Sequence, residues 1–263
     1  MNRQALTILT GAFLLVACGS ENVSIPEKTN GSPPKTMVSG FEFLTESTQA
    51  QQKDSFENPG YFWVDQGQKL FTQAPANGAS CAACHESGLE GVAASYPALD
   101  EQSGQLINLE GRINLCRSRH QNAEPFEYES EDLLALTSYV ANQSAGTPIN
   151  VEVSPETEEN YRNGEEYFFT RRGQFNLSCD QCHNQNWGKK LRGDTISQGH
   201  VNGFPAYRFE WQTLGSLHRR LHDCDTGVRA QPFPLGSQTY IDLEYYLAVR
   251  SSGLEIETPA IRR

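Results

Sequence analysis

The motif Cys-X-X-Cys-His occurs twice, as SCAACH over residues 80–85 and as SCDQCH over residues 178–183. Two thiols three positions apart reach both vinyl groups of a haem, and the histidine that follows meets the iron from one side. A zinc ribbon needs two such pairs within about 15–20 residues of each other, and disulfide pairing does not explain a histidine after both motifs. The pattern predicts two covalently bound haem c groups, attached through Cys81, Cys84, Cys179 and Cys182, with His85 and His183 as iron ligands.

The second axial ligand of each haem is the next question, because c-type haems often use methionine. The chain has two methionines, Met1 and Met37, and neither is placed to serve a haem. Two further cysteines, Cys116 and Cys224, each follow an arginine by four positions, in RINLC (112–116) and RLHDC (220–224). The histidines outside the motifs do not repeat in this way. We therefore expect Cys116 on the first iron and Cys224 on the second, with bis-histidine ligation and a disulfide between the two cysteines as alternatives.

The chain also contains an internal repeat. With the two motifs superimposed at an offset of 98 residues, Trp63 falls on Tyr161 and Phe71 on Phe169, so an aromatic-rich helix precedes each motif. Further along, LTSYVANQSAG (136–146) matches LEYYLAVRSSG (243–253), and both have the apolar spacing of a helix. Each half then consists of an N-terminal helix, the haem motif, a loop-rich middle and a C-terminal helix. Each half resembles a class I c-type cytochrome domain, which implies a mainly α fold of two tandem domains, at residues 46–148 and 149–263.

The N-terminal residues have the features of an export signal. Arg3 precedes a short apolar run, residues 6–16, that is too short to span a bilayer as a mature helix. Residues 15–18, Leu-Val-Ala-Cys, resemble a bacterial lipobox, which predicts a lipoprotein signal peptide over residues 1–17 and lipid attachment at Cys18. An ordinary cleaved signal is the alternative. Residues 18–45 are rich in glycine, serine and proline and predict a flexible tether. We expect a periplasmic protein, anchored to the membrane as a lipoprotein through Cys18.

Composition restricts the partners. The formal net charge is −11 and the estimated pI is about 5.0, which argues against nucleic acid as a partner. A protein partner with a neutral or positive surface is compatible with this charge. The hydrophobic fraction of 37% fits small, loop-rich domains whose core is completed by a large cofactor.

Two haem motifs, each followed by a lone cysteine, together with HRRLHDC (218–224), resemble the diheme SoxA family. These are catalytic subunits of the SoxAX cytochrome, L-cysteine S-thiosulfotransferase. The resemblance implies that Cys224 is both a haem ligand and a persulfide, and that Arg220 binds the substrate. It also implies that thiosulfate is joined to a cysteine of the sulfur carrier SoxYZ, and that electrons pass through haem to a monohaem SoxX subunit and a soluble cytochrome c. The planar donor fork of arginine suits an oxyanion such as thiosulfate.

Several features leave other functions open. A thiosulfate dehydrogenase that forms tetrathionate, or a membrane-tethered diheme electron carrier, has comparable motifs. Matching cysteines in both halves argue against the dehydrogenase, and the lack of methionine ligands argues against the carrier.

Arg219 is a weaker candidate for substrate binding, and Arg112 is expected to have a structural or propionate-binding role. We expect His218 and His222 to face solvent or haem propionates.

Overall fold

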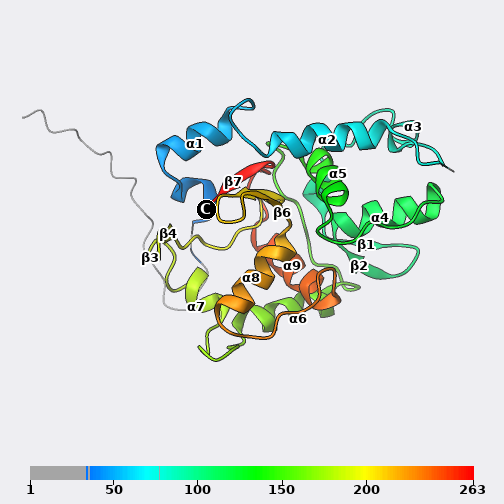
Figure 1. The fold of residues 1–263 in the computed structure, drawn as a ribbon. Helices are drawn as coiled ribbons and strands as arrows, with labels where there is room; N and C mark the ends of the chain where they lie inside the picture. The colour runs from blue at the N-terminus through cyan, green and yellow to red at the C-terminus, as the bar shows by residue number, and fades with distance from the viewer. Residues whose placement is uncertain (1–33, 35, 77) are drawn as a thin grey trace, which may run out of the picture.

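The computed structural model describes residue 34, residues 36–76 and residues 78–263. The predicted signal peptide, Cys18 and the first part of the predicted tether lie outside the described residues. The described chain is mainly helical, and its two halves form two lobes that lie side by side (Figure 1). No helix in this described part is both long and apolar enough to cross a membrane.

The first lobe is built from four helices and a hairpin. Helix α2 (Tyr61–Thr72) leads to the short helix α3 (Cys81–Cys84), which holds the first haem motif. The 3-10 helix η2 (Val92–Ser95) and the antiparallel hairpin of β1 (Ala98–Asp100) and β2 (Gln105–Ile107) follow. Helices α4 (Leu109–His120) and α5 (Glu131–Asn142) complete this lobe.

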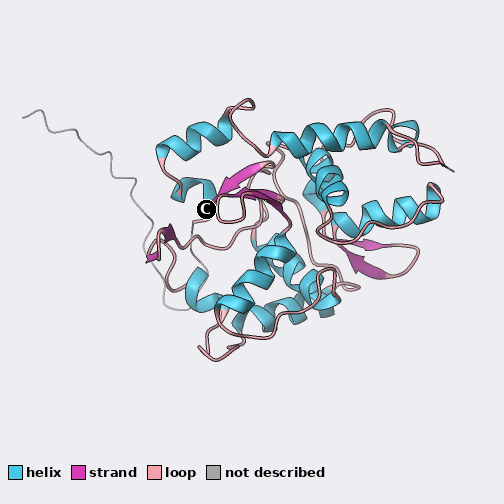
Figure 2. Cartoon of the chain, in the orientation of Figure 1, coloured by secondary structure: helices cyan, strands magenta, loops and turns pink. Residues whose placement is uncertain are grey.

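The second lobe repeats this order with additional strands. Helices α6 (Glu158–Phe169) and α7 (Cys179–His183) correspond to α2 and α3, and α8 (Leu217–Gly227) and α9 (Gln238–Arg250) correspond to α4 and α5. A small hairpin, β3 (Lys190–Leu191) and β4 (Asp194–Thr195), follows α7. Strand β5 (Ala206–Arg208) pairs antiparallel with β6 (Thr213–Gly215) and parallel with β7 (Ala260–Arg262) (Figure 2).

In both lobes the N-terminal and C-terminal helices cross in close contact at a glycine. A Cβ atom on Gly67 would lie 2.0 Å from the backbone oxygen of Ala135, and one on Gly164 would lie 2.1 Å from that of Asp242. Real Cβ atoms do not approach backbone this closely, so glycine is required at both crossings. An aromatic pair seals each crossing, Phe71 with Tyr139 and Phe168 with Tyr246, both at 5.2 Å between ring centroids.

These contacts correct the alignment made from the sequence. Phe71 is equivalent to Phe168, which is buried, and not to Phe169, whose side chain is exposed. The two helices are therefore related by 97 residues and not by 98. The reason is one extra residue in the connection from α6 to the second haem motif, which an ungapped comparison cannot detect.

The segment between each haem motif and the C-terminal helix also differs from the prediction. It is not loop-rich throughout, because Cys116 lies on α4 and Cys224 on α8. Both helices begin at a polar cap: the Asn108 side chain accepts a hydrogen bond from the Gly111 N–H at 2.9 Å, and that of Ser216 from the Arg219 N–H at 3.1 Å. Such caps stabilise the otherwise unpaired N–H groups of the first turn.

The lobes share a hydrophobic core and exchange segments at their boundary. One buried cluster combines side chains from both lobes: Ala94, Leu106, Ile149, Val151, Ile241, Tyr245, Ala248 and Ile256. Residues 148–149, at the predicted domain boundary, run beside the chain that follows α9. Helix α1 (Glu46–Lys53), which the prediction assigned to the first domain, packs against β7 of the second lobe, and the Gln52 side chain accepts a hydrogen bond from the Ile261 N–H at 2.9 Å.

The end of the predicted tether is also held against the second lobe. The Val38 N–H donates to Oε1 of Gln198 at 2.8 Å, and the 3-10 helix η1 (Gly40–Phe43) is capped by Ser39. The Phe43 ring meets Trp187 edge-on, 6.3 Å between centroids. Residues 38–43 are therefore part of the folded unit, which composition alone did not indicate.

Candidate haem sites and the cysteine pair on helices α4 and α8

The first haem motif forms a single helical turn. Ser80 caps α3 by accepting a hydrogen bond from the Ala83 N–H at 3.2 Å. The Gln121 side-chain amide donates to the Ala79 carbonyl at 2.8 Å and to the Cys81 sulfur at 3.4 Å, which ties the motif to the end of α4. The Cys81 thiol is half-buried and that of Cys84 is exposed.

Cys116 faces this motif from α4, one helical turn after Arg112. Burial raises the pKa of the Cys116 thiol, the Arg112 charge opposes this rise, and the negative charges of Cys81 and Cys84 add to it. The three sulfurs are therefore within electrostatic range of one another. The structure thus brings together the three cysteines that the sequence assigned to the first haem, while His85 packs 6.3 Å from the Phe71 ring between centroids.

The second haem motif is held by hydrogen bonds at its cap and at its histidine. Ser178 and Gln181 form a capping box at the start of α7. Nδ1 of His183 lies 2.9 Å from the Ser197 carbonyl oxygen, so this nitrogen carries the proton of the neutral ring and Nε2 is left as a lone-pair donor. Burial lowers the pKa of His183 to about 4, a shift that the Ser197 contact partly opposes. A neutral imidazole with its Nε2 free is the form that binds iron.

Cys224 faces this second motif from α8. Burial raises the pKa of Cys179 to about 12, and the nearby Cys224 sulfur is the next largest cause. The pKa of Cys182 rises for the same two reasons, burial first. The six cysteines of the described chain are unpaired, and Cys116 and Cys224 belong to separate clusters. The alternative of a disulfide between them is therefore wrong.

Asp225, the residue after Cys224, anchors this part of α8. Its carboxylate accepts hydrogen bonds from the hydroxyls of Tyr167 at 2.6 Å and Tyr240 at 2.8 Å, and it pairs with Arg172 at 3.3 Å. These bonds join α8 to α6 and α9. The position of Cys224 is therefore determined by packing contacts from two other helices.

Arg220 lies one helical turn before Cys224 and is half-buried. Its pKa is raised above the ordinary arginine value, chiefly by the charge of Cys224 and against the effect of burial. The described residues form no hydrogen bond or ion pair with its guanidinium. It is therefore a charged donor fork that remains available beside the sulfur.

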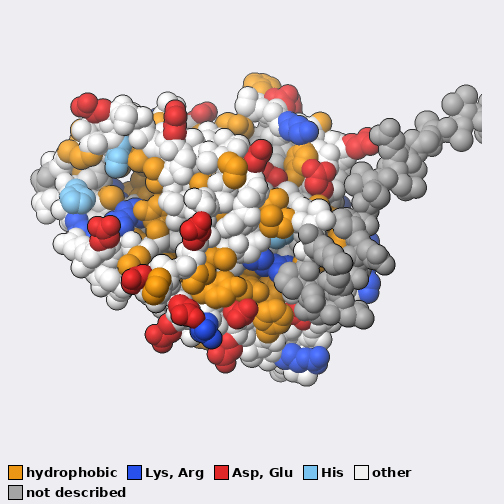
Figure 3. Space-filling model, turned by 180° about the vertical axis from the view of Figure 1, so that it is seen from behind, with side chains coloured by type: hydrophobic (Ala, Val, Ile, Leu, Met, Phe, Trp, Pro, Cys, Tyr) orange, Lys and Arg blue, Asp and Glu red, His pale blue; other side chains and the backbone are white. Residues whose placement is uncertain are grey.

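Each cluster consists of two motif thiols, one histidine and one thiol from a different helix. This donor set fits haem c, because the motif thiols would form thioether bonds, and the histidine and the remaining cysteine would serve as iron ligands. On the face seen in Figure 3, hydrophobic side chains gather in a patch that is bordered by both acidic and basic side chains.

Comparison with known proteins agrees with this geometry. A family model described as the SoxA/TsdA cytochrome c domain matches residues 66–149 and 163–256. The L-cysteine S-thiosulfotransferase subunit SoxA of Pseudaminobacter salicylatoxidans is 38% identical over 238 residues, covering 89% of this chain and 83% of the relative. The chain belongs to the SoxA family. The subunit of the same name from Paracoccus pantotrophus is 33% identical over 259 residues, covering 95% and 89%.

A solved structure extends this family relationship to three dimensions. The crystal structure of SoxXA from P. pantotrophus contains a chain that matches this SoxA-family chain with a TM-score of 0.82 and 34% identity. The match covers 86% of this chain and 87% of the other. The mainly α fold with two cytochrome c domains is thereby confirmed. Cytochrome c domains bind haem c, which agrees with the donor sets described above.

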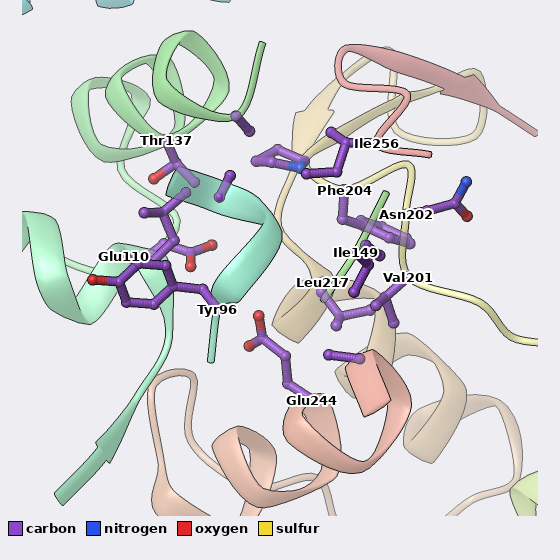
Figure 4. A pocket seen from close by; sticks show the side chains of 15 residues that line it. Tyr96, Glu110, Thr137, Ile149, Val201, Asn202, Phe204, Leu217, Glu244 and Ile256 are labelled. Carbon is purple, nitrogen blue, oxygen red and sulfur yellow. The ribbon is translucent and has the colours of Figure 1, made fainter. Parts of the chain in front are cut away.

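Between the two lobes of this SoxA-family chain lies a buried ionisable cluster that the sequence did not predict. His218 is 1% exposed, its Nδ1 accepts a hydrogen bond from the Gly236 N–H at 3.0 Å, and its Nε2 lies 3.0 Å from a Glu244 oxygen. The expectation that His218 faces solvent or a propionate is therefore wrong. Glu110 and Glu244 line a cavity of about 70 Å³ at this boundary (Figure 4).

Arg219 and His222, also left open by the sequence, occupy different surroundings. The Arg219 guanidinium stacks on the Trp211 ring, 4.3 Å from its centroid, and lies 3.7 Å from a Glu129 oxygen. His222 is half-buried on α8. The packing of Arg219 gives it a structural partner on each side, unlike the neighbouring Arg220.

Proposed function

We propose that this chain is the catalytic diheme subunit of an L-cysteine S-thiosulfotransferase that acts in periplasmic thiosulfate oxidation. One observation carries this proposal. Arg220, a charged guanidinium beside Cys224, forms no ion pair at contact distance with a carboxylate of the described residues, whereas its counterpart Arg112 is paired with Asp100 at 3.0 Å. A guanidinium whose donors are unused, next to a cysteine sulfur, is suited to hold a small sulfur oxyanion.

The proposed cofactors are two haem c groups. Cys81, Cys84, His85 and Cys116 would hold the first, and Cys179, Cys182, His183 and Cys224 the second. Haem c supplies a one-electron acceptor that can pass electrons onward. The SoxA names of the relatives and the duplicated donor sets support this assignment.

Within this site Arg220 would bind the sulfonate oxygens of thiosulfate and orient its outer sulfur toward an incoming thiol. The thiol belongs to a carrier protein of the SoxYZ type. When the carrier S–H bond breaks and an S–S bond forms to the outer sulfur of thiosulfate, one proton and two electrons are released. Cys224, which we propose carries a persulfide, lies where this sulfur chemistry takes place. Persulfides belong to the reversible modifications of cysteine.

The proposed partners follow from the same assignment. A SoxX-type monohaem subunit would form a heterodimer with this chain, by analogy with the matched SoxXA structure from P. pantotrophus. A soluble cytochrome c would accept the electrons. Attachment to the membrane through lipid on Cys18 is part of this proposal and rests on the lipobox-like residues alone.

The test is Cys224→Ala in the heterodimer, with Cys116→Ala as the matched control. We expect the Cys224 variant to keep covalently attached haem, because Cys179 and Cys182 are unchanged, yet to lose thiosulfate-dependent turnover with the carrier by roughly 100-fold or more. The Cys116 variant should keep most turnover, since that sulfur lies in the other cluster. Haem counting separates loss of function from loss of folding. Full turnover of a haem-replete Cys224→Ala protein would overturn the proposal.

Two further measurements complete this test. Peptide mass analysis should find about 32 Da of added sulfur on Cys224 and none on Cys116, as expected for a persulfide. Product analysis without the carrier should show little tetrathionate. Rapid tetrathionate formation by the wild-type heterodimer would instead identify a thiosulfate dehydrogenase.

A further inference from the structure

Arg208, at the end of β5, is a buried cation that the sequence did not single out. The residue is 6% exposed, and its Nε–H has no hydrogen-bond partner in the described structure. One terminal nitrogen lies 3.4 Å from an oxygen of Glu210, whose side chain is largely exposed. A buried guanidinium with an unused donor is costly unless an acceptor completes its bonding. Arg208 therefore has unused capacity to bind an anion.

The surroundings of Arg208 place it next to the turn of α8 that carries Cys224. Its guanidinium lies over the Trp211 ring, 5.1 Å from the centroid. The indole N–H of Trp211 donates to Oδ2 of Asp223 at 2.7 Å, and Asp223 immediately precedes Cys224. The hairpin of β5 and β6 thus connects Arg208 with α8 through Trp211, which lies under the guanidinium and donates to Asp223.

Arg208 also interacts electrostatically with Arg220 and Cys224. Burial, and next the positive charge of Arg220, lower the pKa of Arg208 to about 10, so both guanidiniums are charged at neutral pH. The nearby Cys224 sulfur partly offsets this shift. Two like charges in one half-buried region repel each other. A dianion bound between them would attract both guanidiniums and offset their repulsion.

We propose that Arg208 is a second oxyanion contact for the substrate, which acts together with Arg220 beside Cys224. This inference rests on the proposed function and deepens it. The sulfonate end of thiosulfate has three oxygens, and the fork of Arg220 can take two while the Nε–H of Arg208 takes another. The pair selects dianions that carry a sulfonate group over monoanions, because each of two fixed cations gains from a second negative charge.

The test uses Arg208→Gln in the haem-loaded heterodimer, with Arg229→Gln as the matched control. Arg229 is another arginine of the second lobe, stacked on Phe175 at 4.8 Å and hydrogen-bonded to Gln174, so its replacement removes the same charge from a side chain with other partners. The measurements are KM and kcat for thiosulfate, the inhibition constant of sulfate as an unreactive dianion, and the midpoint potential of each haem.

We expect Arg208→Gln to raise both the KM for thiosulfate and the inhibition constant of sulfate about tenfold, as for loss of one charge-assisted hydrogen bond. The haem potentials and haem content should stay close to wild type, and Arg229→Gln should change none of these values. Arg208→Lys keeps the charge but not the fork, so it should give an intermediate increase. It also decides the matter if Arg208→Gln fails to assemble.

Unchanged KM and sulfate inhibition in whichever of these two variants assembles would overturn the inference. A shifted potential of one haem with unchanged KM would show that Arg208 pairs with a haem propionate instead, and would also overturn it. Neither result touches the proposed function, which stands or falls with Cys224→Ala. The two claims therefore fail separately.

Discussion

The two candidate haem sites have the same plan, and they differ in the contacts of one arginine. In the first lobe Arg112 donates from Nε to the Tyr96 hydroxyl at 3.0 Å and pairs with Asp100 at 3.0 Å. Asp100 also holds Arg119 at 2.8 Å. In the second lobe Arg220 occupies the equivalent position on α8, but within the described chain its largest electrostatic partner is Cys224 itself.

Under the proposed function, this difference explains why two similar donor sets would have different chemistry. Beside Cys116 the Asp100 carboxylate pairs with both Arg112 and Arg119, so the Arg112 guanidinium already has an anionic partner. Beside Cys224 the Arg220 guanidinium has no ion pair within the described residues, and the Nε–H of Arg208 has no hydrogen-bond partner there. The histidines of the two motifs differ as well. The Ser197 carbonyl orients His183, whereas the described residues provide His85 with no such hydrogen bond.

Replacing the two equivalent arginines tests the comparison most directly. We expect Arg220→Gln to lower kcat/KM for thiosulfate by roughly 100-fold, the cost of losing hydrogen bonds from a charged group to the substrate. Arg112→Gln should leave kcat/KM close to wild type and lower the melting temperature, because it removes bonds to Asp100 and Tyr96. Steady-state kinetics and thermal unfolding of the two variants measure both effects.

Arg220→Lys provides the control for charge without the donor fork, and it should recover part of the loss. Equal kinetic losses in Arg112→Gln and Arg220→Gln would show that the two lobes are functionally alike. That result would remove the distinction between a ligand-only site and a substrate site.

Asp100→Asn tests whether this carboxylate has the structural role that the first lobe assigns to it. Hydrogen bonds from Arg119 and then from Ser103 hold the pKa of Asp100 below its usual range. A depressed folded-state pKa gives stability that is fully present above about pH 4, the ordinary value, and that is lost as pH falls toward the folded-state pKa. We expect Asp100→Asn to lower the melting temperature by several degrees at pH 7 and to flatten the decline in acid.

Thiosulfate turnover in Asp100→Asn should stay near the wild-type level once the protein is folded, because this carboxylate lies in the first lobe. An exposed acidic residue, Glu101, offers the control, since Glu101→Gln should leave the melting temperature unchanged at both pH values. A large loss of turnover in folded Asp100→Asn would contradict the separation of the two sites.

The haem motifs, the two extra cysteines and the C-terminal helices could be predicted because their signals are local in the sequence. The spacing of the two cysteines and the histidine in CxxCH already specifies how haem would be attached. The four-residue spacing between arginine and cysteine equals about one helical turn in both lobes. The family and the mainly α fold followed from these residues. The domain boundaries stay predictions, and so do the roles of Cys116, Cys224 and Arg220, which the experiments above address.

Other features could not be predicted because they depend on contacts between distant segments. The packing of α1 on β7 joins residues about 200 positions apart, with Gln52 bonded to Ile261. His218 had the sequence context of a surface histidine, yet Glu244 from α9 and Tyr128 from the first lobe enclose it. Arg208 belongs to a three-residue strand, and only the folded hairpin places it over Trp211.

The smallest expected effect concerns Glu110, in the cluster between the lobes (Figure 4). Burial, and next the charge of Glu244, raise the pKa of Glu110 from 4.5 to about 7. The folded protein then binds this proton more tightly than the unfolded chain, so stability falls as pH rises from 4.5 to about 7. Glu110→Gln mimics the protonated form, and it should reduce that decline by about 1–2 kcal/mol between pH 5 and 8.

Melting temperatures across this pH range measure the effect, with exposed Glu86→Gln as a control that should follow the wild-type curve. His218 acts in the same direction: burial lowers its pKa, but the carboxylates of Glu244 and Glu110 raise it overall, so its contribution is also lost as pH rises. The slope should therefore diminish in Glu110→Gln without vanishing. If the cluster only joins the lobes, Glu110→Gln will change this slope and leave thiosulfate kinetics unchanged. That result would show that the contact between the lobes affects stability and not the sulfur chemistry proposed for the second lobe.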